Sequence, residues 1–273
     1  MSKEIRFLII VPTFNSFKKL RRLKKSILSQ TFQNWSVIFI DAPSNQKHKE
    51  WLSACVDFDK RFKSYEESKK IKGIFPSMSY GAGFAKKNDW IIFLGSDDWF
   101  YSKNSLFSIA KTISQNLRKI DQKLIIYGTQ FIHKNNREVI RINNIPKFRF
   151  ISNKKLSNLL FFGYVPTHQS LCFSYDLIKK LMPYSNKYNL AADSDLIFKM
   201  LSLKEFKIVF IKKVLINIQA GGLSSKNLNK RLKEVLLIYI NHYRFNFFIP
   251  FILRYLKKIL SRLKLINRLK NFI

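Results

Sequence analysis

The sequence predicts an α/β protein with a Rossmann-like, mostly parallel mixed sheet, flanked by helices and followed by a basic amphipathic helical tail. Apolar runs at residues 7–11, 37–40 and 90–94 have the length and composition of strands that are buried on both faces. Segments with helical spacing of apolar residues alternate with these runs. After residue 226 only helical patterns remain, which sets the tail apart.

Strand and helix patterns alternate through the first hundred residues. In chain order, we expect strands at residues 7–11, 37–40, 61–65 and 90–94. A helical pattern ending near Gln30 follows the first strand, and a polar helix follows the second. Ligands of parallel sheets bind beyond the carboxyl ends of the strands, so we expect a cleft there. The polar residues at these strand ends are Thr13, Asp41, Asp97 and Asp98.

The second half has a less regular order of elements. We expect strands at residues 124–131, 139–142, 169–173, 208–211 and 215–218, and helices at residues 175–182 and 193–203. Such a mixed half is typical of the part of an α/β protein that receives a second substrate. Without internal repeats or a low-complexity linker, residues 1–225 are expected to form one domain and residues 226–273 a helical appendage.

Composition excludes several classes of protein. With 47% hydrophobic and 15% aromatic residues, the 273-residue chain can bury enough apolar surface to fold, which excludes a disordered protein. Its two cysteines, Cys55 and Cys172, form neither a disulfide framework nor a zinc-ligand pattern, so a reducing compartment is expected. No signal sequence and no apolar run of about 20 residues are present, which predicts a cytoplasmic protein without a transmembrane anchor.

The charge is strongly positive. Fifty Lys and Arg against seventeen Asp and Glu give +33, a field that attracts phosphates of nucleic acids, anionic lipids or nucleotides alike. Much of this charge is equally consistent with a solvated surface encoded by an A+T-rich genome. A nucleic-acid-binding protein whose aromatic residues stack on bases is one alternative, but it explains none of the strand-end motifs.

The adjacent carboxylates Asp97 and Asp98 are the sharpest local feature. At the end of an apolar strand, such a pair offers hard oxygen ligands to Mg²⁺ or Mn²⁺. The alternative is a capping role before a helix that starts near Lys103.

Three further segments allow both a structural and a chemical role. Asp193 and Asp195 open a helix, where carboxylates commonly cap, but one of them could instead act as a general base. His168 lies just ahead of a strand, where a loop hydrogen bond is the common role. Gly221-Gly222 is either a phosphate-binding loop or a plain turn.

Taken in order over residues 5–225, these segments resemble family 2 glycosyltransferases of the GT-A fold, especially the bacterial branch that builds capsular, exopolysaccharide and lipopolysaccharide sugars. The specificity lies in the ordered set rather than in any one motif. The matching segments are Val11-Pro-Thr-Phe-Asn15, Ser26-Ile-Leu-Ser-Gln-Thr31, Ile40-Asp-Ala-Pro-Ser44, Gly73-Ile-Phe-Pro-Ser-Met-Ser-Tyr-Gly81, Phe93-Leu-Gly-Ser-Asp-Asp-Trp99 and Ala192-Asp-Ser-Asp-Leu196.

The resemblance implies roles for individual residues. Asp193 would be the general base and Asp98 would hold Mn²⁺ or Mg²⁺, with Asp97 supporting the metal or the ribose. The donor nucleotide would be bound by Pro12, Thr13, Asn15, Asp41, Ser96 and Asp97. The acceptor or diphosphate side would include His168, Gln169, Gly221, Gly222 and Ser224.

The implied reaction is a single displacement that inverts the anomeric configuration. A nucleotide-diphosphate sugar, most simply a UDP-sugar, would donate to a saccharide or lipid-linked acceptor. Two departures from the family pattern, Pro76 and Ser79, keep open a catalytically impaired relative that only binds nucleotide sugar, although the presence of both Asp98 and Asp193 argues against it.

The tail, residues 247–273 from Phe247 to Ile273, has the pattern of a helix that lies on a membrane. Seven Lys or Arg and no acid occur between Arg254 and Lys270. The apolar positions at helical spacing are Ile252, Leu256, Ile259, Leu260, Leu263 and Ile266. We therefore expect a peripheral protein on the inner face of the cell membrane, with anionic lipid rather than nucleic acid as partner. The alternative is that this stripe packs on the catalytic domain as core.

Overall fold

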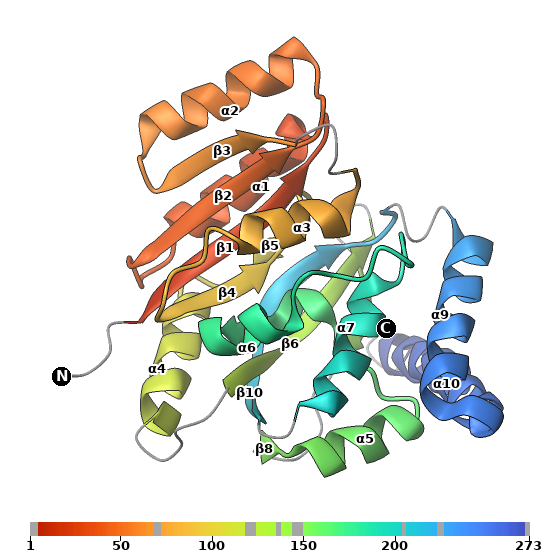
Figure 1. Ribbon diagram of the computed structural model, residues 1–273. Coiled ribbons are helices and arrows are strands. Elements are labelled where there is room, and N and C mark those ends of the chain that lie inside the picture. The colour runs from red at the N-terminus through yellow and green to blue at the C-terminus, as the bar shows by residue number, and fades with distance from the viewer. Residues whose placement is uncertain are drawn as a thin grey trace.

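The computed structural model describes residues 5–67, 72–117, 124–134, 138–143, 150–203, 206–222 and 227–270 (Figure 1). Its strands are β1 (Arg6–Thr13), β2 (Trp35–Asp41), β3 (Phe62–Glu66), β4 (Asp89–Phe93), β5 (Trp99–Phe100), β6 (Leu124–Lys134), β7 (Glu138–Asn143), β8 (Phe150–Ile151), β9 (Leu171–Ser174) and β10 (Lys207–Gln219). Its α-helices are α1 (Phe17–Leu28), α2 (Gln46–Phe58), α3 (Ile74–Ala82), α4 (Ser105–Leu117), α5 (Asn153–Phe161), α6 (Tyr175–Leu181), α7 (Ala192–Lys199), α9 (Leu228–Tyr243) and α10 (Phe248–Lys270).

One mixed sheet runs through the molecule in the order β3-β2-β1-β4-β9-β6-β10-β5, with β7 beside β6 and β8 beside β10. β3, β2, β1 and β4 are parallel, so their carboxyl ends meet at one edge. β9 is antiparallel to both β4 and β6 and joins this half to the second. The predicted mixed α/β sheet is confirmed, and its edge at β1, β2 and β4 is where the strand-end motifs lie.

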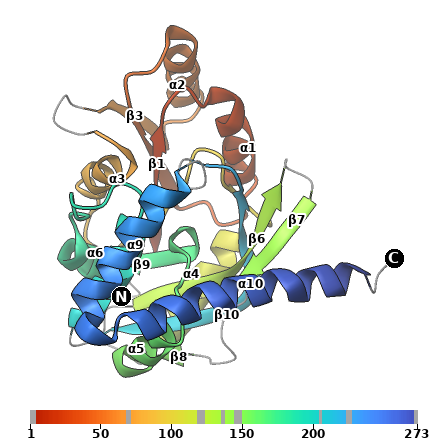
Figure 2. The same cartoon turned by 90° about the vertical axis from the view of Figure 1, so that its right-hand side faces the viewer.

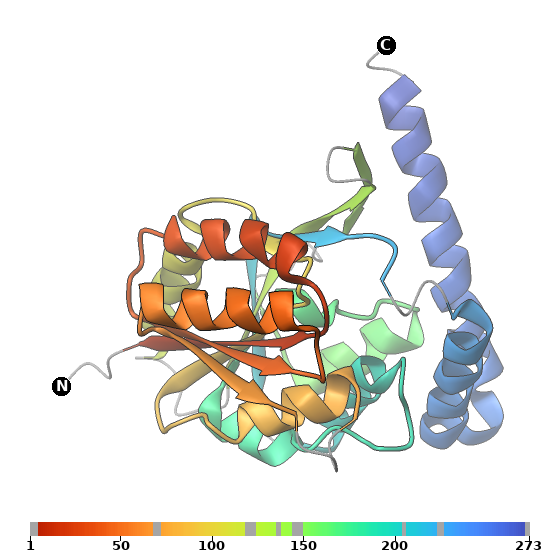
Figure 3. The ribbon, with the colours of Figure 1, turned by 90° about the horizontal axis from the view of Figure 1, so that it is seen from above.

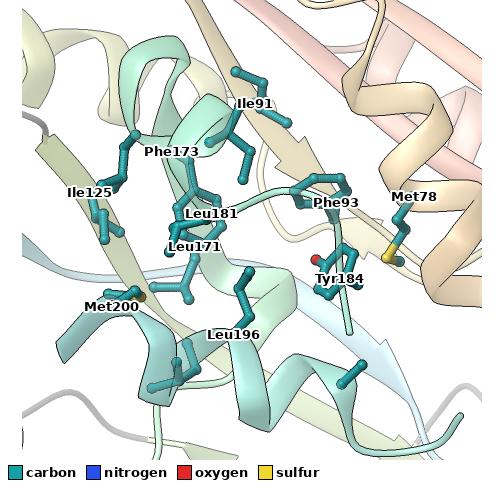
Figure 4. Close-up of a cluster of buried hydrophobic side chains, with 14 of the residues drawn as sticks. Met78, Ile91, Phe93, Ile125, Leu171, Phe173, Leu181, Tyr184, Leu196 and Met200 are labelled. Atoms are coloured by element: carbon teal, nitrogen blue, oxygen red, sulfur yellow. The ribbon is translucent and has the colours of Figure 1, made fainter. Parts of the chain in front are cut away.

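Helices cover both faces of the sheet, as Figures 1 and 3 show. Because side chains alternate along a strand, β1 sends Phe7, Ile9 and Val11 into the core beneath α1, α2 and α4. Leu8 and Ile10 point into the opposite core, which α3, α6, α7 and α9 cover. Figure 4 shows this second core, where Met78 of α3 and Leu196 of α7 lie with Phe93 and Tyr184. Burial on both faces explains why the early strands are continuous apolar runs.

The second half differs from the prediction at several boundaries. The two strands predicted at 208–211 and 215–218 form one strand, β10, whose register against β6 shifts between Ile211 and Val214. The polar pair Lys212-Lys213 is exposed at this bulge rather than in a turn. His168–Ser170 forms a 3₁₀ turn, so β9 begins later than predicted, and α7 ends at Lys199 before the 3₁₀ turn Met200–Ser202.

Over the residues whose side chains are described, the C-terminal helices pack on the rest of the chain with one side. Val235, Ile238 and Tyr239 of α9 belong to the core that α7 covers, and Phe247 and Phe251 pack against it. Figures 2 and 3 show α10 passing beside α9 and then projecting beyond the body of the molecule. Within the described ranges no helix is long and apolar enough to cross a membrane. The domain boundary at residue 225 stays a prediction.

Candidate active site

Asp41, at the end of β2, is held by an ordered hydrogen-bond network. It is 3% exposed, and its Oδ1 accepts from Thr13 Oγ1 at 2.9 Å and from Ser44 Oγ at 2.8 Å. Thr13 ends the neighbouring strand and stands opposite Asp41 in the parallel register. Both donors reach the same oxygen, so the carboxylate is fixed in orientation while Oδ2 is left to other partners.

His48, which the sequence did not single out, completes this network. It is buried in the first turn of α2, and its Nε2 lies 3.0 Å from Asp41 Oδ1. Its Nδ1 accepts the Ser16 backbone N–H at 3.2 Å, so the proton of the neutral ring is on Nε2. Burial lowers the pKa of His48, while Asp41 opposes that shift. The only sequence signal was the Asn45 cap three residues earlier, whose side chain accepts the His48 N–H.

The loops after β1 and β2 are joined by a reciprocal pair of hydrogen bonds. The Asn15 backbone N–H donates to Ser44 Oγ at 3.0 Å, and Asn45 N–H donates to Asn15 Oδ1 at 2.8 Å. Asn15 has φ +47, a left-handed conformation that asparagine tolerates better than most residues. Pro12 is partly exposed beside these loops. The structure thus brings Thr13, Asn15 and Asp41 together.

Asp97 and Asp98 differ sharply in surroundings. Asp98 is 2% exposed, and its Oδ2 accepts the Gly95 N–H at 2.7 Å. Burial raises the pKa of Asp98 well above its usual range, and the neighbouring Asp97 raises it further, while backbone N–H groups of Gly95 and Gln219 and the charge of Arg22 oppose the shift. Asp97 is partly exposed and its Oδ2 lies 3.1 Å from Lys19 Nζ. Of the two, Asp97 therefore offers the more accessible oxygen.

A cationic and aromatic side supports this acidic pair. Arg22 of α1 donates to the Asp97 backbone carbonyl at 3.1 Å, and its guanidinium lies 3.4 Å from the centre of the Trp99 ring. The Trp99 ring in turn contacts His133, whose Nε2 lies 2.8 Å from Asn217 Oδ1. Because Arg22 and Lys19 both come from α1, that helix supplies positive charge next to the two carboxylates. Ser96 is partly exposed in the same turn.

The acidic pair fits a divalent cation that a phosphate ligand helps to hold. Burial is the main cause of the raised pKa of Asp98 and the negative charge of Asp97 is the second, and a bound cation would relieve the repulsion between the two carboxylates. The described part of the chain holds no group of three or more His, Cys, Asp or Glu placed to bind one ion. The protein would therefore supply one or two ligands and a diphosphate the others.

Asp193 lies in the first turn of α7, partly exposed, where its Oδ1 accepts the Ser194 N–H at 2.7 Å. Beneath it, His168 and Tyr184 form a buried hydrogen-bonded pair. Burial lowers the pKa of His168 to about 4 against the opposing charge of Asp193. Asp195 is half-buried, 3.6 Å from Lys199 and with a pKa raised by burial. Asp193 and Asp195 are both partly exposed on this helix.

Phe93 connects the two groups of residues. Its ring stacks on His168 with centroids 5.1 Å apart, and the chain continues from Phe93 directly into the turn that holds Asp97 and Asp98. His168 is packed away from solvent, and Gln169 beside it is partly exposed. The α7 and Asp97-Asp98 segments therefore flank one end of β4.

The glycine turn follows β10 at the same edge. Gln219, whose backbone N–H binds Asp98, comes two residues before Gly221. A Cβ added at Gly221 or at Gly222 would meet no atom of the described residues within 4 Å. Gly221 has φ +99, however, and its backbone therefore requires glycine. Ser224 lies outside the described residues.

Two departures from the family pattern have structural explanations in α3. The helix begins at Ile74 with Gly73 as its cap, so Pro76 lies in the first turn, where its missing N–H costs little. Ser79 Oγ donates to the Phe75 carbonyl and accepts the Tyr184 backbone N–H at 3.0 Å. Ser79 therefore links α3 to the loop before α7.

The layers of the sheet, its parallel acidic edge and the mixed second half define a GT-A α/β fold. This fold recurs in the first 349 residues of Staphylococcus aureus TarS in complex with UDP, with TM-score 0.64, 16% identity, and 87% of this chain and 66% of that one covered. A mannosyltransferase of Pyrobaculum calidifontis, solved with GDP-Man and Mn²⁺, matches with TM-score 0.59 and 12% identity over 88% of this chain and 64% of that one. The chain covers 40% of the longer TarS structure.

The model of Glycosyl transferase family 2 matches residues 8–175, more than half of the chain. The chain therefore belongs to family 2 of the glycosyltransferases. A PGL/p-HBAD biosynthesis glycosyltransferase of Mycobacterium bovis is 24% identical over 226 residues, which cover 82% of this chain and 81% of the relative.

Proposed function

We propose that this glycosyltransferase moves a sugar from a UDP-sugar to a saccharide or lipid-linked acceptor, with inversion, in the synthesis of a bacterial surface polysaccharide. The observation that carries the proposal is the shared edge of the sheet, where the ordered Asp41 carboxylate and the Asp97-Asp98 pair lie at or after strand ends within the family 2 match. Asp193 lies beyond that match, in the first turn of α7. The TarS complexes with UDP and with UDP-GlcNAc support a uridine nucleotide as donor.

On the donor side, each residue has a role suited to its surroundings. Asp41, fixed by Thr13, Ser44 and His48, would accept a hydrogen bond from the base or ribose. Pro12 and Asn15 would line the nucleoside, and Ser96 would bind near the ribose. Asp97 and Asp98 would hold Mn²⁺ or Mg²⁺, with Asp97 supplying the exposed oxygen, and the cation would neutralise the leaving diphosphate. Gly221 and Gly222, which follow Gln219, would lie along that diphosphate.

On the acceptor side, Asp193 would take the proton from the attacking hydroxyl. Its Oδ1 is occupied by the Ser194 N–H, which orients the carboxylate, and its partial exposure lets a hydroxyl approach. The acceptor oxygen then attacks C1 of the sugar as the UDP leaves, which inverts the anomeric centre. Gln169, partly exposed near the buried His168, is a candidate acceptor contact.

The outer face of α10 supports a membrane surface as the place of action. The residues Phe248, Ile249, Ile252, Leu256, Ile259 and Leu260 recur at helical spacing and are 40–55% exposed. Basic residues of the same helix, apart from the buried Arg254, would meet anionic lipid head groups. An enzyme held this way would reach a lipid-linked acceptor without spanning the bilayer.

Calorimetric titration with UDP and GDP, each with and without Mn²⁺, tests the donor proposal. We expect UDP to bind more tightly with Mn²⁺, and Asp97→Ala to remove roughly tenfold or more of that metal-dependent gain. Asp176→Ala, an exposed acid on α6, is the matched control and should leave both affinities unchanged.

Three outcomes would contradict parts of the proposal. Equal UDP affinity with and without Mn²⁺ would contradict the proposed metal site. Tighter binding of GDP than of UDP would contradict a UDP-sugar as the donor. UDP binding without any turnover of a screened set of UDP-sugars and acceptors would favour the catalytically impaired relative.

A further inference from the structure

Glu234 of α9 holds the stretch of chain that leads into α7. Its Oε1 accepts the Asn189 backbone N–H at 3.1 Å, and its Oε2 accepts the N–H groups of Leu190 and Ala191 at 2.7 and 2.9 Å. We call residues 188–191 the α7 entry loop. Three backbone donors on one carboxylate fix the path of this loop two residues before Asp193.

Glu234 is 7% exposed, which makes its position costly unless its oxygens are satisfied. The three backbone N–H groups donate to both oxygens, and these charge-assisted hydrogen bonds compensate the carboxylate for the water it loses on burial. A buried acid that joins residues more than 40 positions apart is not needed to form α9 itself. Its contacts are directed at the entry loop.

Further contacts from the same two helices reach the loop and α7. Asn241 Nδ2 of α9 donates to the hydroxyl of Tyr188 at 3.0 Å. Arg254 of α10, which is 4% exposed, donates to Ser194 Oγ at 3.2 Å. The α10 backbone at Arg254 lies so close to Gly163 that a Cβ there would be 2.5 Å from the Arg254 nitrogen. α10 is therefore seated on the body of the protein at the level of Asp193.

We propose that α9 and α10 position the catalytic base, with Glu234 as a positioning residue that sets the approach of Asp193 to the acceptor hydroxyl. The proposal rests on the assignment of Asp193 as the base. The two faces of the C-terminal helices thus have different roles. The outer face of α10 meets the surface that carries the acceptor, and the inner faces of both helices hold the segment that carries Asp193.

The first test is amide hydrogen exchange by NMR on the full chain. Glu234→Ala should speed exchange of the Asn189, Leu190 and Ala191 amides at least tenfold while leaving β1 amides unchanged. Glu234→Gln keeps one acceptor oxygen, so it should retain protection at Leu190 and Ala191 and lose it at Asn189. Lys233→Ala, the exposed neighbour on α9, should change none of them. Unaltered exchange in Glu234→Ala, or loss of protection throughout the chain, overturns the proposal.

The second test is a double-mutant cycle with Asp193→Asn, measured as UDP release from whichever of UDP-GlcNAc and UDP-glucose the wild-type enzyme turns over. Glu234→Ala should lower kcat at least tenfold with donor KM unchanged, Glu234→Gln should recover part of it, and the Asp193→Asn background should show no further loss. An equal loss in both backgrounds overturns the positioning role. If Asp193→Asn alone retains full turnover, the base assignment fails, whatever the exchange data show.

Discussion

At the residue scale, the donor side depends on Asp41 having a single orientation. Thr13, Ser44 and His48 all reach its Oδ1, and His48 is itself fixed by the Ser16 N–H. The position of Asp41 at a strand end was predictable because the apolar run of the strand stops directly before it. The role of His48 was not, because its ring is brought to Asp41 by the packing of α2 and no local pattern marks it. Glu234 escaped notice for the same reason, since its partners are more than 40 residues away.

Replacing His48 tests this orientation. His48→Ala removes a buried polar contact of Asp41, and we expect UDP affinity to fall roughly tenfold, the equivalent of about 1.4 kcal/mol. Calorimetry measures this directly. His242→Ala, on the far helix α9, is the control and should bind UDP like the wild type. Equal affinities for both variants would show that Asp41 does not need His48.

The buried His168 should make stability depend on pH. Its pKa is lowered to about 4 in the folded protein, whereas the unfolded chain has the ordinary value near 6.5. Between these values only the unfolded chain binds the proton, so the free energy of unfolding falls as pH drops from about 6.5 to 4, by about 3 kcal/mol in total. Urea unfolding at several pH values measures this slope. In His168→Gln the slope over that window should be shallower, and an unchanged slope would place the titration elsewhere.

At the element scale, apolar runs predicted the early strands well because both faces of β1, β2 and β4 are buried. The prediction failed where a strand bends. Lys212-Lys213 reads as a break between two strands, yet both residues are exposed at a bulge in β10, and the ladder with β6 continues past them. The bulge carries Leu215 over Gly128, where a Cβ would lie 2.2 Å from the Leu215 side chain. That close approach depends on tertiary packing, which no local sequence pattern reveals.

Substitutions on α10 test whether its exposed apolar stripe binds lipid. Changing Ile252, Leu256 and Ile259 to Ser should weaken sedimentation with anionic liposomes at least tenfold, because the burial of three aliphatic side chains is lost. The melting temperature should stay constant, since these side chains are about half exposed. Phe107→Ser, an exposed apolar site on α4, is the control. Wild-type protein that ignores the liposomes at low salt would contradict the membrane proposal.

At the scale of the whole molecule, the C-terminal helices belong to both the fold and the proposed site. The sequence pattern separated apolar from basic positions on α10, and the stripe at Ile252 and Leu256 does face outward. What the pattern could not reveal is the inner face, where Phe251 joins the core and Arg254 reaches Ser194. In the sequence, the buried Arg254 cannot be told from the solvated basic residues around it, because its burial depends on packing against α7.

The most direct test of the account is the turnover of Asp193→Asn beside its affinity for UDP. Asparagine keeps the shape of the side chain and the position of α7 but cannot accept the acceptor proton, so we expect kcat to fall by roughly two or more orders of magnitude. UDP affinity with Mn²⁺ should stay within error of the wild-type value. A variant that keeps near-normal turnover, or one that loses UDP binding together with activity, would contradict the assignment of Asp193 as the base of this glycosyltransferase.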